Sequence, residues 1–135
     1  MAKTHPHITS PTETQLREIV ADRSEPIVET YLEFHNVVLS ALPEIANEVD
    51  TVDAAIGYGA RQYGYSGWGM AAVMPYSKWV SLTLMQGARL DVTSDLLTGS
   101  STMRHVKLSK PEDIAKRRDE ITRLLVAASQ LHANG

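Results

Sequence analysis

The spacing of the hydrophobic residues changes near residue 53, and this change restricts the chain to folds that combine helices with a sheet. Before that point, apolar residues recur every three or four positions, as in Ile27, Tyr31 and Phe34, which is typical of an amphipathic helix. After it, short apolar and aromatic runs are separated by Gly or Pro, which is typical of strands joined by turns. The sequence therefore predicts an α+β domain.

Helix start and stop signals occur at both ends of the chain. Ser10-Pro11-Thr12-Glu13 matches a capping box with proline at the first helical position. Asp22 or Ser24 is expected to cap a second helix, which Pro43 ends because proline disfavours helix in the residue before it. Ser109-Lys110-Pro111-Glu112 matches another capping box and predicts one long terminal helix. The residues of this last helix expected to face the core are Ile114, Ile121, Leu125 and Ala128.

Strands are expected between these helices. Their approximate positions are residues 53–58, 61–66, 68–74, 78–86 and 103–108. In the fourth of them, Val80, Leu82 and Leu84 share one face, whereas Trp79 lies on the other. One apolar face and one mixed face indicate an antiparallel sheet that helices cover on one side. A loop with one helical turn at 95–97 is expected at residues 91–99.

These patterns together predict a two-layer α+β fold. An antiparallel sheet of about five strands is expected to pack against the N- and C-terminal helices. The single domain is expected to occupy residues 10–135, after a disordered tail at residues 1–9.

Composition limits the class of protein. The chain has 135 residues, of which 43% are hydrophobic and 21% charged, as is usual for a globular domain. It has no cysteine, which excludes disulfides and thiolate metal sites and fits a reducing compartment. The N-terminal residues show no apolar signal-peptide run, and no uncharged stretch is long enough to span a bilayer. We therefore expect a cytoplasmic protein with no membrane partner.

Charge is distributed unevenly. The formal net charge is −3, with 3 basic and 10 acidic residues at positions 1–60 but 7 basic and 4 acidic residues at positions 101–135. The overall negative charge is wrong for a dedicated nucleic-acid-binding protein, so we expect no nucleic-acid partner. The asymmetry fits self-association as a homodimer, intramolecular attraction, or an acidic face that binds a cation.

Residues 57–79 hold five of the eight glycines and six of the eight aromatic residues. Tyr and Trp combine a large apolar surface with a polar group that a ligand can use, so a functional surface is expected here. The glycine spacing does not fit a dinucleotide-binding loop, because Gln62 stands where the third glycine would be. The residues of this stretch expected to bind a ligand are Tyr58, Arg61, Tyr63, Tyr65, Trp68 and Trp79.

Three further residues are candidates for the same surface. Arg104 shares a strand face with Val106, so its guanidinium is expected to be partly buried and to need a carboxylate or carbonyl partner. The alternative is that Arg104 binds an anionic ligand together with Arg89 and Arg61. His105 alternates outward from Val106 and is a candidate site residue.

His35 is expected to be a structural residue instead. It flanks the apolar face of its helix beside Tyr31 and Leu39. We expect a partly buried, hydrogen-bonded imidazole there.

Glu25, Glu29 and Glu33 share one face of the second predicted helix. Carboxylates at this spacing repel one another, and a bound cation would relieve the repulsion. Their oxygens suit hard ions such as magnesium, calcium or iron, so these three are the candidate metal ligands. The alternative is an ordinary solvated helix face opposite the apolar stripe.

Several motifs together resemble the YdhG-like family of small bacterial domains. They are Gly57-Tyr58-Gly59, Gln62-Tyr63-Gly64-Tyr65, the paired apolar strands around Pro75-Tyr76, Gly87-Ala88-Arg89-Leu90 and Met103-Arg104-His105-Val106-Lys107-Leu108. The resemblance covers roughly residues 25–130. It implies an antiparallel sheet backed by helices and, for members described as frataxin-like, iron as a cofactor or cargo.

The sequence is consistent with three hypotheses about the function of this chain. No nucleophile, base and orienting residue can be assigned together, because no motif such as G-x-S-x-G is present. The first hypothesis is therefore a non-enzymatic binding module for a metal or small ligand. The alternatives are a self-associating domain with an aromatic interface and an enzyme acting on a small anionic substrate.

Overall fold

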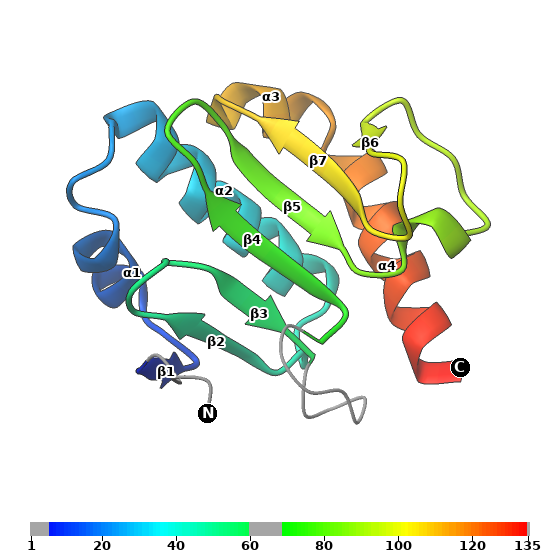
Figure 1. Ribbon diagram of the computed structural model, residues 1–135, viewed down its shortest axis with the longest axis horizontal. Helices are drawn as coiled ribbons and strands as arrows, with labels where there is room; N and C mark the ends of the chain where they lie inside the picture. The colour runs from blue at the N-terminus through cyan, green and yellow to red at the C-terminus, as the bar shows by residue number, and fades with distance from the viewer. Residues whose placement is uncertain (1–5, 60–68, 135) are drawn as a thin grey trace.

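An antiparallel sheet forms one layer of the molecule, and helices form the other (Figure 1). The computed structural model describes residues 6–59 and 69–134. Within them, seven strands lie in the order β1-β2-β3-β4-β5-β7-β6. The helices gather behind the central strands in the view of Figure 1, with α2 across the middle and the C-terminal helix at one side. The predicted α+β class is confirmed.

The elements of the described chain are short strands and two long helices. The strands are β1 (His7–Thr9), β2 (Asn47–Asp50), β3 (Ile56–Tyr58), β4 (Ala71–Pro75), β5 (Val80–Leu84), β6 (Leu97–Thr98) and β7 (Arg104–Leu108). The helices are α1 (Glu13–Ile19), α2 (Glu25–Ala41), α3 (Pro111–Lys116) and α4 (Arg118–Asn134), with a 3₁₀ turn η1 (Gly87–Arg89).

The sheet is larger than the five strands expected. β1 forms where a disordered tail was predicted, because His7, Ile8 and Thr9 pair with β2. β6 replaces the helical turn expected near residue 96 and pairs with β7. β1, β6 and the likewise unpredicted β2 are only two to four residues long, so their alternation is too brief to be recognised in the sequence. The strand expected at 61–66 lies outside the described residues.

The first helix begins two residues later than its predicted cap. Thr12 is the N-cap: its hydroxyl oxygen accepts a hydrogen bond from the amide of Gln15, and the Gln15 side chain accepts one from the amide of Thr12. Ser10 instead donates its amide to the carbonyl of Asn47 at 3.0 Å, which extends the β1–β2 pairing. Ser10 and Thr12 could each have capped this helix. Because Ser10 pairs with Asn47 in the sheet, Thr12 is the cap.

α2 forms as predicted and supplies much of the core. It begins after Ser24 with Pro26 in its first turn, and it ends before Leu42 and Pro43. Its buried apolar residues are Ile27, Tyr31, Leu32, Phe34, Val37 and Val38. They pack with strand residues such as Val73, Leu82 and Val106, so the core lies between the sheet and α2.

The C-terminal helix is divided in two where a single helix was expected. Ser109 does not cap it, because its hydroxyl donates to the carbonyl of Lys78 and Lys110 takes the N-cap position. At Arg117 the backbone leaves helical geometry, with φ −115° and ψ 17°. The residues predicted to face the core are nevertheless buried: Ile114, Ile121, Leu125 and Ala128.

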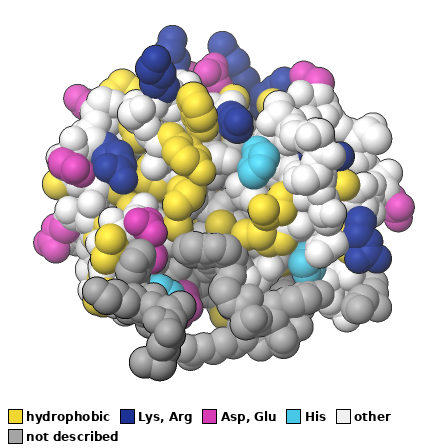
Figure 2. Space-filling model, viewed as in Figure 1, with side chains coloured by type: hydrophobic (Ala, Val, Ile, Leu, Met, Phe, Trp, Pro, Cys, Tyr) yellow, Lys and Arg dark blue, Asp and Glu magenta, His cyan; other side chains and the backbone are white. Residues whose placement is uncertain are grey.

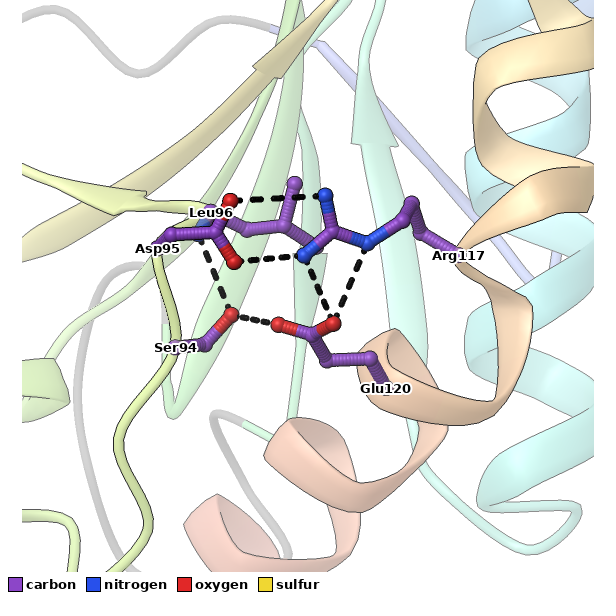
Figure 3. A network of polar contacts seen from close by, with 5 residues as sticks. All are labelled: Ser94, Asp95, Leu96, Arg117 and Glu120. Carbon is purple, nitrogen blue, oxygen red and sulfur yellow. Dashed lines mark hydrogen bonds and ion pairs between the residues drawn. The ribbon is translucent and has the colours of Figure 1, made fainter.

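Arg117 joins the two helices to a distant loop (Figure 3). Its guanidinium donates to Asp95 at 2.6 Å and to Glu120 at 2.7 Å, and it lowers the pKa of the Asp95 carboxyl through this hydrogen bond and its charge. The Ser94 hydroxyl donates to Glu120 and accepts from the amide of Leu96. The network holds the loop before β6 against the start of α4.

Candidate functional site: the outer face of the sheet

The face of β4, β5 and β7 turned away from the helices carries the candidate site, and we call it the outer face. Val73, Leu82 and Val106 are register partners buried against the helices. Their neighbours therefore point outward, because successive side chains of a strand alternate. The residues of the outer face used below are Met74, Tyr76, Trp79, Ser81, Thr83, His105 and Lys107.

Trp79 lies at one end of the outer face and is half-buried. Its ring packs at a tilt against Tyr76, with centroids 5.7 Å apart. The Nζ atom of Lys107 lies 5.2 Å from the centroid of the indole, within the range of a cation–π contact. The indole Nε1 is buried and has no hydrogen-bond partner among the described residues. Trp79 is thus off the main core, as its alternation with Val80 predicted.

A chain of polar side chains crosses the outer face next to Trp79. The hydroxyls of Ser81 and Thr83 are 3.2 Å apart, and the Thr83 hydroxyl lies 2.8 Å from Nδ1 of His105. Desolvation lowers the pKa of His105, and the charges of Lys107 and Arg104 lower it further. His105 is therefore neutral near pH 7, and a neutral imidazole can both donate and accept a hydrogen bond.

The outer face carries the positive charge of Lys107 and no acidic residue from its strands. Strands β4, β5, β6 and β7 contain no Asp or Glu, whereas β7 contributes His105 and Lys107 to this side. Figure 2 shows this side of the molecule, with hydrophobic side chains through the middle and histidine and basic side chains beside them. No described helix covers it in Figure 1. The arrangement offers a positive charge, an aromatic surface and hydrogen-bonding groups.

Tyr58 does not belong to this face. Its side chain is fully buried on the helix side of the sheet, and its hydroxyl lies 2.7 Å from Nδ1 of His35. Burial raises the pKa of Tyr58 and lowers the pKa of His35 to about 4. The expectation of a buried, hydrogen-bonded His35 is confirmed, and Tyr58 is its partner in the core.

Arg104 lies on the side of β7 opposite His105. It is partly buried and has a carbonyl partner, that of Met103 at 3.2 Å, as expected. No described carboxylate pairs with it. Its side chain packs against Gly87, where an added Cβ would stand 2.6 Å from the Cβ of Arg104. Arg104 therefore supports the turn that carries Arg89 and does not face the outer surface.

Arg89 and the remaining candidates lie elsewhere. Arg89 ends η1, at the end of β5 away from Trp79, so the outer face does not include it. Four candidate residues lie outside the described residues and are not placed: Arg61, Tyr63, Tyr65 and Trp68.

The acidic residues of α2 are partly neutralised. Glu29 pairs with Arg17 at 2.8 Å, and Glu33 pairs with Arg118 at 3.3 Å. In residues 6–59 and 69–134, no group of three or more His, Asp or Glu side chains is arranged to hold a metal ion. The helix face that was expected to bind a cation therefore already has cationic partners from α1 and α4.

Sequence reasoning missed most of the polar chain on the outer face. Ser81 and Thr83 belong to the strand face described above only as mixed, and Lys107 was given only as part of a motif. Strand alternation places all three on the side of Trp79 and His105, but only the register of β5 with β7 places Thr83 opposite His105. That register was not predictable from either strand alone.

No protein-family model matches this chain, and no curated protein or solved structure is significantly similar to it. None of the helices in the described part of the chain combines the length and apolar character that crossing a bilayer requires.

Proposed function

We propose that this chain is a non-enzymatic binding module that takes up a small anionic ligand on the outer face. The observation that carries the proposal is the position of Lys107 beside Trp79 on a sheet face formed by strands without acidic residues. The ammonium group of Lys107, held over the indole of Trp79, can form an ion pair with an anionic ligand. The indole can pack against an apolar or planar part of the same ligand.

The polar chain supports binding and not acyl transfer. Ser81, Thr83 and His105 resemble a nucleophile with a base, but no described Asp or Glu contacts His105 to orient it. The imidazole is held by Thr83 through Nδ1 and keeps Nε2 for a further hydrogen bond. Ser81 is buried, and its hydroxyl contacts only that of Thr83 among the described residues, so we assign Thr83 and His105 the role of selecting and orienting a bound group.

The experiment that tests the proposal is an amide NMR titration with benzoate, a planar anion, and with benzylamine as a cation of similar shape. We expect benzoate to shift amides of β5 and β7 and benzylamine to leave them unchanged. Lys107→Gln should weaken benzoate binding by roughly threefold or more, in line with the loss of one charge at a partly exposed site.

The matched control is Lys116→Gln, which removes an exposed lysine from α3 and changes the net charge equally. Equal effects of the two variants, or equal binding of both probes, would overturn the proposal. A concentration-dependent dimer in sedimentation whose formation broadens the same amides would favour the self-association hypothesis instead. Membership of the YdhG-like family, frataxin-like packing, iron binding and a cytoplasmic location all remain predictions.

A further inference from the structure

A hollow lies at the end of β5 opposite Trp79 and is separate from the outer face. It is formed between the segment after η1 and the C-terminal half of α4, with a volume of about 510 Å³. This volume is within the range of small-molecule sites. Figure 1 shows η1 and α4 together at the right of the molecule, whereas the β4–β5 turn before Trp79 lies at the upper left.

Two charged side chains of opposite sign line this hollow without neutralising each other. The guanidinium of Arg89 has one hydrogen bond, to the neutral amide of Gln86 at 3.4 Å, and Arg89 forms no ion pair with any described residue. Asp91 likewise has no ion pair within residues 6–59 and 69–134. By contrast, Arg17 and Arg117 each contact two carboxylates, so neither guanidinium has the same freedom to pair with an anionic ligand.

The rest of the wall is largely apolar. Its hydrophobic residues are Leu90, Val92, Ala127 and Leu131. Val92 is 38% exposed, so its side chain is accessible from the hollow. The positive charge of Arg89 reaches the α4 side of the hollow, since it helps to lower the pKa of His132 after the larger effect of burial.

We propose that this hollow binds a small zwitterion with an aliphatic side chain, such as an α-amino acid. Its carboxylate would pair with Arg89, its ammonium group with Asp91, and its side chain would pack against Val92 and Leu131. A ligand with only a negative charge would pair with Arg89 but would be repelled by Asp91. A ligand with only a positive charge would pair with Asp91 but would be repelled by Arg89. Only a ligand with both charges can pair with both residues.

The test is a calorimetric titration with L-leucine, 4-methylpentanoate and 3-methylbutylamine. The two analogues keep the branched alkyl chain and lack the ammonium group and the carboxylate, respectively. We expect leucine to bind more tightly than either analogue, by roughly threefold or more, because each analogue lacks one ion pair at an exposed site. Amide shifts on leucine binding should map to residues 88–92 and 127–131.

Variants separate the two charges. Arg89→Gln should bring the affinity for leucine to that for 3-methylbutylamine, and Asp91→Asn should bring it to that for 4-methylpentanoate. The matched controls are Arg123→Gln and Asp119→Asn, which make the same changes at exposed positions of α4 outside the hollow. Both controls should bind leucine like the unmodified protein.

Several results would overturn this inference. They are the absence of leucine heat, equal affinity for leucine and either analogue, and amide shifts at β5 and β7 in place of the hollow. The first two do not bear on anion binding at the outer face, because that site does not use Arg89 or Asp91. The third would move leucine to the outer face and would leave the benzoate proposal standing. The two proposals can therefore fail independently.

Discussion

The hydroxyl of Tyr58 lies 2.7 Å from Nδ1 of His35 in the core between β3 and α2. Both groups are neutral near pH 7, because burial raises the pKa of the phenol and lowers that of the imidazole. The two rings are also close, with centroids 5.8 Å apart. Tyr58, which belongs to the stretch at residues 57–79, thus links the sheet to α2.

Tyr58→Phe should destabilise the fold, because it leaves Nδ1 of His35 buried without its partner. We expect a loss of about 1–3 kcal/mol in the free energy of unfolding, measured with urea. The control is Tyr76→Phe, which removes the hydroxyl of an exposed tyrosine and should change stability by less than about 0.5 kcal/mol. Equal losses in the two variants would show that the buried Tyr58–His35 hydrogen bond stabilises the fold no more than the exposed hydroxyl of Tyr76 does.

Stability should fall as the pH decreases from about 6.5 toward 4, in part because of His35. Its pKa in the folded protein is about 4, against 6.5 for an unperturbed histidine. In this window the unfolded chain binds a proton on His35 that the folded protein does not, so protons favour unfolding. Between pH 6.5 and 4 the titration of His35 lowers the free energy of unfolding by about 3 kcal/mol in total. Below pH 4 the contribution of His35 no longer changes.

His35→Gln isolates this contribution, because carboxylates titrate in the same pH range. The variant should have a flatter curve of unfolding free energy against pH between 6.5 and 4 than the unmodified protein. Parallel curves would mean that His35 is protonated in the folded protein as easily as in the unfolded chain.

Trp79→Ala should be tolerated better than removal of a core aromatic residue. Trp79 is half-buried on the outer face, so we expect a stability loss below about 2 kcal/mol. Phe34→Ala, at a fully buried position of α2, should cost roughly 3–5 kcal/mol in the same thermal denaturation series. A loss at Trp79 as large as that at Phe34 would make the indole a structural residue and remove it from the proposed site.

Gly87→Ala should strain the contact between η1 and β7. The new Cβ would lie 2.6 Å from the Cβ of Arg104, which is too close for two carbon atoms. We expect a loss of about 1–3 kcal/mol, as for other overpacked positions. The contact can be isolated in a double-mutant cycle with Arg104→Gly, which removes the opposing Cβ. Additive losses in that cycle would exclude this clash as the cause.

The iron hypothesis predicts how substitutions of the α2 glutamates and of their arginine partners change the affinity for Fe²⁺. If the acidic face of α2 binds Fe²⁺, the combined change Glu25→Gln, Glu29→Gln and Glu33→Gln should abolish the heat of an anaerobic titration. Because Arg17 and Arg118 hold two of these carboxylates, replacing both arginines by glutamine should strengthen binding severalfold. A titration without heat in the unmodified protein and in the arginine variant would end the hypothesis.

Elements with a local signal were predictable. The apolar stripe of α2 and the alternation in β5 each extend over enough residues to fix the type of element and its buried face. The same alternation correctly put Trp79 and His105 away from the core. β1, β2 and β6 were missed because strands of two to four residues form only when a neighbour supplies their hydrogen bonds.

The sequence by itself determined the α+β class, the buried faces of the long elements and the absence of cysteine chemistry, because these depend on residue type and local spacing. Only the tertiary structure decided which distant residues meet. Thr83 and His105 are 22 positions apart, and His35 and Tyr58 are 23 positions apart. Their contacts depend on strand register and on where α2 crosses the sheet, and many competing packing interactions set both together.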